Sequence, residues 1–482
     1  MVTEQAVRYS ELPIEDIKWS SVPLSEVINS GNRLEASVFG IEGRRARDVV
    51  VNNKWGSTLL YGKDGLATAY TCGRFKRIWL DRSALPIYQP SSITDIKPTP
   101  DGFLSRLTKT NLEALRVRKG QILLTCSGTI GKIALVSDTL DGEIFSHDLI
   151  RLDVKKPSDI GYVYAFLRSN IGNALIKTSS YGAVIQHIEP EHLANIPIPN
   201  SPEPIKARIN DAIVKSYESR DESNVLIDKA TTLLMDELKL PPLNDFSIEY
   251  FDEDAEAKTF SVRSSDLIGR LDASYHIPIV AAIKKHISKY ASEVTTIGDK
   301  RVSKDIILPG RFKRVYVGEK QGRVFFGGKQ IRELDPTNKK YLSLVHHGER
   351  IKKQLELRKN MTLVTRSGTI GKVNIVPKHW ECWVASDHII RIEPANTDIA
   401  GYLYAFLASD YGHILISRFT YGSVVDEIDA NHVSKIFFPL LKNIDVQNEI
   451  NCLVLKANGL RYEAYLHEQE AMKILDEEVF FV

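Results

Sequence analysis

The second half of the chain repeats the first half, and this duplication constrains the fold more than any other feature of the sequence. One string, Ser-Gly-Thr-Ile-Gly-Lys, stands unchanged at residues 127–132 and 367–372. Other strings recur in the same order at an offset of 237 to 240 residues: 33–37 with 270–274, 73–77 with 310–314, 161–167 with 401–407, and 181–182 with 421–422. Half of 482 residues is 241, so the duplication fills the chain. Two similar units are expected, able to pack about a pseudo-two-fold axis.

Each repeat begins with a segment of mixed strand and helix character. The short apolar runs at 121–125 and 361–365 end at Ser-Gly, which predicts a strand followed by a turn, with residues 132–136 as the return strand. Residues 161–176 have apolar side chains at helical spacing and predict one helix. The sequence therefore predicts an α+β fold with two similar mixed α/β domains.

Each repeat then ends in a long helical pattern. Apolar residues recur every three to four positions through residues 205–234 and again through 446–475. A helix of about 35 residues would be roughly 50 Å long, which exceeds the depth of one small domain. We expect the two helices to pack on each other as an antiparallel coiled coil. The alternative is that each helix packs only on its own domain.

These patterns predict four segments along the chain. Residues 1–200 form a first mixed α/β domain and 201–240 a first long helix. Residues 241–440 hold a linker and a second such domain, and 441–482 a second long helix.

Composition excludes several classes of protein. The four cysteines, at positions 72, 126, 382 and 452, include no C-x-x-C pair, so zinc and redox motifs have no support. No run of about 18 apolar residues predicts a membrane span, and the acidic N-terminal stretch lacks the apolar core of a secretory signal. A reducing, cytoplasmic location is expected.

The near-neutral total charge of +2 hides two basic blocks. Residues 44–132 hold 16 Lys and Arg against 6 Asp and Glu, and residues 300–372 hold 19 against 6. Both blocks lie at the same place in their repeats and mix cations with aromatic residues, as in Arg-Phe-Lys-Arg-Ile-Trp at 74–79. Such blocks suit contact with DNA phosphates, whereas the alternative is an ordinary solvated surface.

Several catalytic motifs fail on inspection. Ser-Gly-Thr-Ile-Gly-Lys lacks the first glycine of a phosphate-binding loop and the Ser or Thr after the lysine, so both copies are interpreted as tight turns. Ser146-His147-Asp148 is matched by Ser386-Asp387-His388, but neighbouring strand residues point to opposite faces, which argues against a triad. His192 and His432 are interpreted as packing or hydrogen-bonding residues. An E-x-K triplet at 256–258 has no counterpart in the first repeat, so the chain is predicted to be non-catalytic.

The order of these strings resembles the specificity (S) subunit of type I restriction-modification systems, over nearly the whole length. The order is RLxAS, a basic segment, SGTIGK, S-x-x-(L/I)-I-R, GYxYAFL, YG and a long helix, all present twice. The resemblance implies two target-recognition domains that each read half of a bipartite DNA sequence. It also implies that the helices set the spacing and dock methylation subunits.

The resemblance implies partners but no chemistry for this chain. The partners are double-stranded DNA, two methylation subunits that would carry S-adenosylmethionine, and restriction subunits, with no membrane; the chain itself would hold no cofactor and no metal. The alternatives are a non-catalytic adaptor of a related defence system and a nuclease fused to recognition domains. The predicted DNA contacts are of the phosphate type, at Arg74, Lys76, Arg77 and Lys132 in the first repeat and Arg311, Lys313, Arg314 and Lys372 in the second. The alternative for Arg74 and Arg311 is an ion pair inside each domain.

Overall fold

The computed structural model describes residues 21–29, 38–80, 85–182, 186–241, 243, 259–267, 269–337, 339–422 and 424–481. The first copy of the RLxAS string, at 33–37, and the E-x-K triplet at 256–258 lie outside the described residues.

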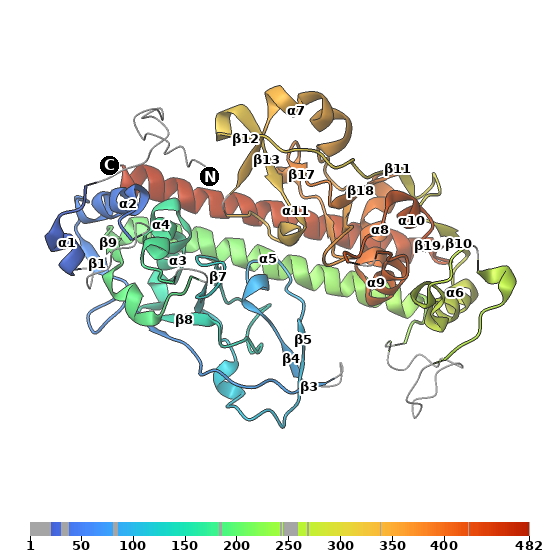
Figure 1. Cartoon of the computed structure of the whole chain (residues 1–482), viewed down its shortest axis with the longest axis horizontal. Coiled ribbons are helices and arrows are strands. Elements are labelled where there is room, and N and C mark those ends of the chain that lie inside the picture. Colours follow the sequence, from blue (N-terminus) through green and yellow to red (C-terminus); the bar gives the residue numbers. More distant parts are fainter. Residues whose placement is uncertain are drawn as a thin grey trace, which may run out of the picture. The chain divides into compact units, whose positions relative to one another are not determined.

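The chain divides into two compact units of mixed α/β structure (Figure 1). The first unit holds Met1–Thr94, Pro98–Lys215 and His467–Val482, and the second holds Asp95–Lys97 and Ser216–Leu466. Each long helix is therefore shared between the units, whereas the sequence predicts the helices as separate segments. The four predicted boundaries remain predictions.

The first unit is built on an antiparallel sheet with strand order β2-β8-β6-β7. Its strands are Ala67–Tyr70, Leu149–Val154, Ile122–Thr125 and Ile133–Leu135. Beside it, β3 (Trp79–Leu80), β5 (Gly102–Leu104) and β4 (Leu85–Ile87) form a small sheet in that order. Strand β1 (Ser57–Leu59) pairs with β9 (Pro197–Pro199), and helices α1 (Leu24–Asn29) and α2 (Ile41–Val51) precede these strands.

The second unit has the same plan. A four-stranded sheet has the order β11-β18-β15-β16, formed by Ser303–Ile307, Ile389–Pro394, Thr362–Thr365 and Val373–Ile375. A second sheet has the order β12-β14-β13-β17, formed by Tyr316–Val317, Lys340–Ser343, Gly322–Phe326 and Val384–Ala385. Strand β10 (Glu293–Thr296) pairs with β19 (Phe437–Leu440). The short helices are α6 (Pro278–Tyr290), α7 (Leu344–Arg350) and α10 (Ala430–Ser434).

The prediction of a single helix at 161–176 is wrong in one respect, because two separate helices occupy this range. Helix α3 (Ile160–Arg168) ends before Ser169, and α4 (Asn170–Thr178) begins after it. The Ser169 hydroxyl accepts a hydrogen bond from the Gly172 amide at 3.1 Å and so caps α4. Ser409 caps α9 (Asp410–Ser417) after α8 (Thr397–Ala408) in the same way. The apolar spacing continues through the break, which is why periodicity alone merges the two helices.

The arginine of the S-x-x-(L/I)-I-R string is a buried structural residue in both repeats. Arg151 on β8 and Arg391 on β18 have no exposed surface. Arg151 donates to backbone carbonyl groups of Leu115 and Phe145, and Arg391 donates in the same way to Leu355 and Ala385. These buried charges therefore tie inner strands to neighbouring backbone and do not belong to a DNA-facing surface.

The long helices are α5 (Glu203–Glu237) and α11 (Ile444–Ile474). Three side-chain contacts join them in the second unit: Ser216 Oγ with the Ala464 carbonyl at 2.7 Å, Glu222 with Lys456 at 3.2 Å, and Lys229 with Glu449 at 3.0 Å. Residue numbers rise along α5 as they fall along α11, so the two helices run antiparallel in this unit. Their packing as a coiled coil over the full length remains a prediction.

Each long helix also packs on a domain of its own repeat through a matched Asn–Gly contact. In the first unit, Asn210 Oδ1 on α5 accepts from the Gly161 amide of α3 at 2.9 Å. In the second, Asn451 Oδ1 on α11 accepts from the Gly401 amide of α8 at 2.7 Å. A Cβ atom on Gly161 would lie 2.7 Å from Asn210 Cα, so the close approach requires glycine. The glycine of the GYxYAFL string is thus explained by helix docking.

We predict that Asn451→Ala lowers the free energy of unfolding by about 1 to 3 kcal/mol, because the buried Gly401 amide loses its acceptor. Thermal unfolding followed by circular dichroism measures this change. Asn431→Ala, at an exposed position of α10, is the matched control and should change little. Equal effects of the two substitutions would contradict the docking role of Asn451.

Candidate nucleic-acid interface

The basic segments 73–77 and 310–314 lead into the first strand of each small sheet, β3 or β12. Their side chains alternate between solvent and the domain. Arg74 and Lys76 are exposed, as are Arg311 and Lys313 at the matched positions. The Phe and Arg between and after them are half-buried: Phe75, Arg77, Phe312 and Arg314. This alternation is typical of an extended chain. It divides the predicted contact residues into those exposed to solvent and those packed against the domain.

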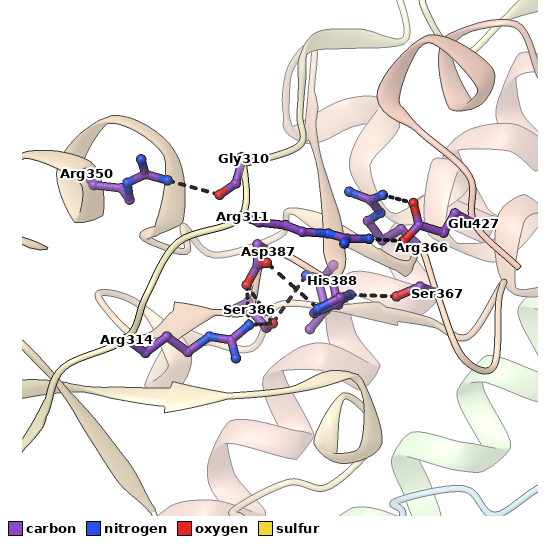
Figure 2. Close-up of polar contacts among 12 residues, drawn as sticks. Gly310, Arg311, Arg314, Arg350, Arg366, Ser367, Ser386, Asp387, His388 and Glu427 are labelled. Atoms are coloured by element: carbon purple, nitrogen blue, oxygen red, sulfur yellow. Dashed lines mark hydrogen bonds and ion pairs between the residues drawn. The ribbon is translucent and has the colours of Figure 1, made fainter. Parts of the chain in front are cut away.

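Arg314 is held by a buried carboxylate. Its guanidinium donates to Asp387 Oδ1 at 2.5 Å, and the Asp387 side chain is only 2% exposed (Figure 2). Burial alone would raise the pKa of Asp387, but the hydrogen bond and charge of Arg314 outweigh burial and lower it below the usual 3.8. In the first repeat, Arg77 instead donates to Ser146 Oγ at 3.3 Å. Both arginines therefore fix the basic segment to the domain.

Arg311 belongs to an ion-pair cluster whose other two members are replaced by different residue types at the matched positions of the first repeat. Glu427 accepts from Arg311 at 2.5 Å and also from Arg366 (Figure 2). Burial would raise the pKa of Glu427, but Arg366 and Arg311 lower it below the usual 4.5. The matched residues in the first repeat are Cys126 for Arg366 and His187 for Glu427.

Arg74 therefore differs from Arg311 in its surroundings. No ion pair of Arg74 occurs among the residues that the structure describes, and its side chain lines a cavity of about 350 Å³ with Lys109 and Asn111. An ion pair inside the domain was the alternative to a DNA contact for both arginines. The structure shows such an ion pair for Arg311. The simultaneous change of Arg366 and Glu427 between repeats was a signal in the sequence that could have located this cluster.

The Ser-Gly-Thr-Ile-Gly-Lys strings form matching tight turns. Gly128 and Gly131 have φ of 69° and 91°, and Gly368 and Gly371 have φ of 76° and 80°. These left-handed values require glycine. The turns join β6 to β7 and β15 to β16, as the sequence predicts for the first copy.

The two lysines that end these strings lie in different surroundings. Lys132 Nζ donates to the Ser91 carbonyl at 3.1 Å and to Thr94 Oγ1 at 3.2 Å. This geometry favours a structural role for Lys132. Lys372 is half-exposed, and its backbone amide donates to Thr365 Oγ1 at 2.9 Å. The DNA-contact prediction for both lysines remains a prediction.

In the second repeat, the Ser386-Asp387-His388 string does not form a catalytic triad. His388 Nδ1 lies 2.6 Å from Ser367 Oγ, a contact that the sequence does not predict (Figure 2). However, His388 Nε2 is 3.8 Å from Asp387, beyond hydrogen-bond range, and Asp387 is engaged by Arg314. His192 and His432 accept from the backbone amides of Glu189 and Asp429, which agrees with their interpretation as hydrogen-bonding residues.

Two other kinds of site were sought in the described part of the chain. No group of three or more His, Cys, Asp or Glu side chains there has the geometry to hold a metal ion. No helix there is both long enough and apolar enough to cross a membrane.

Comparisons with known proteins give matches at the level of structure. No family model matches the chain, and no curated protein matches its sequence. A type I restriction-modification S subunit from M. genitalium is 13% identical, with a TM-score of 0.34 over 88% of this chain and 96% of that one. The HsdS subunit from Thermoanaerobacter tengcongensis is 16% identical, with a TM-score of 0.27 over 86% and 97%.

A chain from a structure on complex assembly and conformational transition of the type I R-M system is also similar. It is 16% identical, with a TM-score of 0.27 over 86% of this chain and 98% of that one. The similar structures are thus of the kind that the sequence motifs resemble.

We predict that Asp387→Asn lowers the stability of the chain at pH 7 by roughly 3 kcal/mol, because Arg314 loses its buried partner. The folded-state pKa of Asp387 is depressed, so its contribution is present above the unfolded value of 3.8 and is lost as the pH falls through the folded value. The difference between wild type and variant should therefore narrow below pH 3.8.

Thermal unfolding from pH 7 to pH 3 measures this difference. Asp305→Asn, at an exposed position on β11, is the control. A difference between wild type and Asp387→Asn that stays constant with pH would rule out the charged pair as its source.

Proposed function

We propose that the chain is the DNA-reading specificity subunit of a type I restriction-modification complex, with each repeat reading one half of a bipartite target. The observation that carries this proposal is the matched pair of basic segments. In both repeats an exposed lysine, Lys76 or Lys313, stands on a segment that a half-buried arginine fixes to the domain. A cation on a fixed segment of backbone suits a phosphate contact, because less backbone freedom is lost on binding.

The long helices would set the distance between the two half-sites. As an antiparallel coiled coil, α5 and α11 would make a rigid spacer of roughly 50 Å, longer than one DNA turn of about 34 Å. Their exposed faces would dock two methylation subunits carrying S-adenosylmethionine, and restriction subunits would join that complex in the cytoplasm. This chain would supply recognition and no chemistry.

The predicted phosphate contacts then differ in their roles. Arg74, Lys76 and Lys313 are exposed and available to DNA, whereas Arg77, Arg314 and Lys132 would act mainly by holding the backbone that carries those contacts. Arg311 and Lys372 would contribute to the field that attracts DNA.

Deleting the gene should remove one bipartite methylated motif from a base-resolution methylation map of the host. Methylation requires target recognition, so loss of a single motif identifies this chain as the subunit that reads it. Reintroducing the gene should restore the motif, which controls for unrelated changes in the deletion strain.

An unchanged map, together with the absence of salt-dependent DNA binding by the assembled complex, would favour the adaptor alternative. Metal-dependent cleavage of DNA by the purified chain alone would favour the nuclease alternative.

Replacing Lys76 and Lys313 by Gln should weaken DNA binding about equally for all sequences. Each lost phosphate contact reduces the slope of log K against log salt by about 0.9. Binding titrations at salt concentrations between roughly 50 and 200 mM measure this slope. The exposed Lys473→Gln on α11 is the control, and an unchanged slope in the double variant would exclude these phosphate contacts.

A further inference from the structure

Each repeat places a half-exposed aromatic ring directly after its basic segment. Trp79 is the first residue of β3 and is 50% exposed, and Tyr316 is the first residue of β12 and is 42% exposed. The two residues occupy matched positions, at the same offset of 237 as the basic segments. Large apolar surface exposed at the same place in two diverged repeats indicates a binding role.

The Trp79 ring is held in place although it is exposed. It lies against Gly102 on the neighbouring strand β5, where a Cβ atom would be 2.6 Å from Trp79 Cζ3. The Arg77 guanidinium lies 5.9 Å from the ring centre. These neighbours cover part of the ring, while half of the residue's surface stays exposed.

The Tyr316 ring is held by different residues to the same effect. It makes an edge-to-face contact with Phe325, with ring centres 5.8 Å apart. Lys340 Nζ lies 5.3 Å from the ring centre. Both rings are therefore fixed before any ligand arrives, so little rotamer entropy is lost on contact.

The exposed cations beside each ring indicate what covers it. Lys76 and Arg74 precede Trp79, and Lys313 precedes Tyr316, so the occupant is a polyanion that also offers an apolar surface. DNA phosphates satisfy the cations, and the apolar group on DNA base edges is the thymine methyl.

We propose that Trp79 and Tyr316 are base-contacting residues that read thymine methyl groups, one in each half-site. This inference rests on the proposed function. It adds sequence-dependent contacts to the phosphate contacts, which carry no sequence information.

Selection of bound duplexes from a random DNA library by the full chain tests the inference. Wild type should select a bipartite motif. Trp79→Ala should erase preferences in one half-site and Tyr316→Ala in the other, with about tenfold weaker binding to the wild-type motif. Neither change removes a cation, so the salt dependence should stay the same. Trp79→Phe should restore part of the lost preference.

Two further variants distinguish an effect of the ring's position from an effect of lost folding stability. Gly102→Ala keeps Trp79 but displaces its ring, so it should impair the same half-site as Trp79→Ala. Val225→Ala, at a position of α5 that is 65% exposed, should leave the whole motif intact. All variants are compared for thermal unfolding, and a change of preference at unchanged stability supports the contact.

The outcomes distinguish the two proposals. If wild type selects no motif, the proposed function and the inference both fail. If wild type selects a bipartite motif and Trp79→Ala and Tyr316→Ala select the same one, the inference alone fails.

Replacing thymine by uracil in a half-site then tests the methyl group. Wild type should bind about threefold to fivefold more weakly for each methyl that is read, whereas the alanine variant should not respond. An equal loss in both proteins, or half-sites without thymine, would overturn the assignment.

Discussion

The contact of each long helix with its own domain is the constraint on which the rest of the structure depends. Asn210 and Asn451 reach across to glycine amides, and the glycines allow the helix backbones to approach closely. The register of this contact fixes where each sheet lies relative to its helix. In the proposed function, this specific docking would hold each basic segment at a defined place along the spacer.

The two repeats use one scaffold but anchor the basic segment differently. In the second repeat, Glu427 and Asp387 hold Arg311 and Arg314, whereas in the first repeat a serine hydroxyl is the partner of Arg77. The half-buried Glu427 and the buried Asp387 pair with two of the cations in the second repeat, while Arg74 has no ion pair among the described residues. Two domains of similar shape can therefore present different patterns of free charge, as two different half-sites would require.

The sequence predicted the strands at 121–125, 132–136 and 361–365, the turns after them and the long helices, because each has a local signal: an apolar run, paired glycines or a repeated apolar spacing. It missed the break at Ser169, since the capping hydroxyl does not interrupt the periodicity. It could not separate Lys76 from Arg77, because adjacent cations differ only in which face of the extended chain they occupy. Glu427 was missed because it lies 116 residues from Arg311 and is brought near only by folding.

In this proposal, the cations would supply affinity for DNA and the aromatic rings would supply sequence preference. Cations attract any DNA, and their strength falls with salt, so a surface made only of exposed lysines would bind without discrimination. A ring fixed against Gly102 or Phe325 contributes only where a matching apolar group meets it. The acidic remainder of the chain, which brings the total charge to +2, further limits contact away from the basic segments. Specificity would then come from short-range contacts of the rings, added to an electrostatic affinity that the acidic remainder of the chain keeps low.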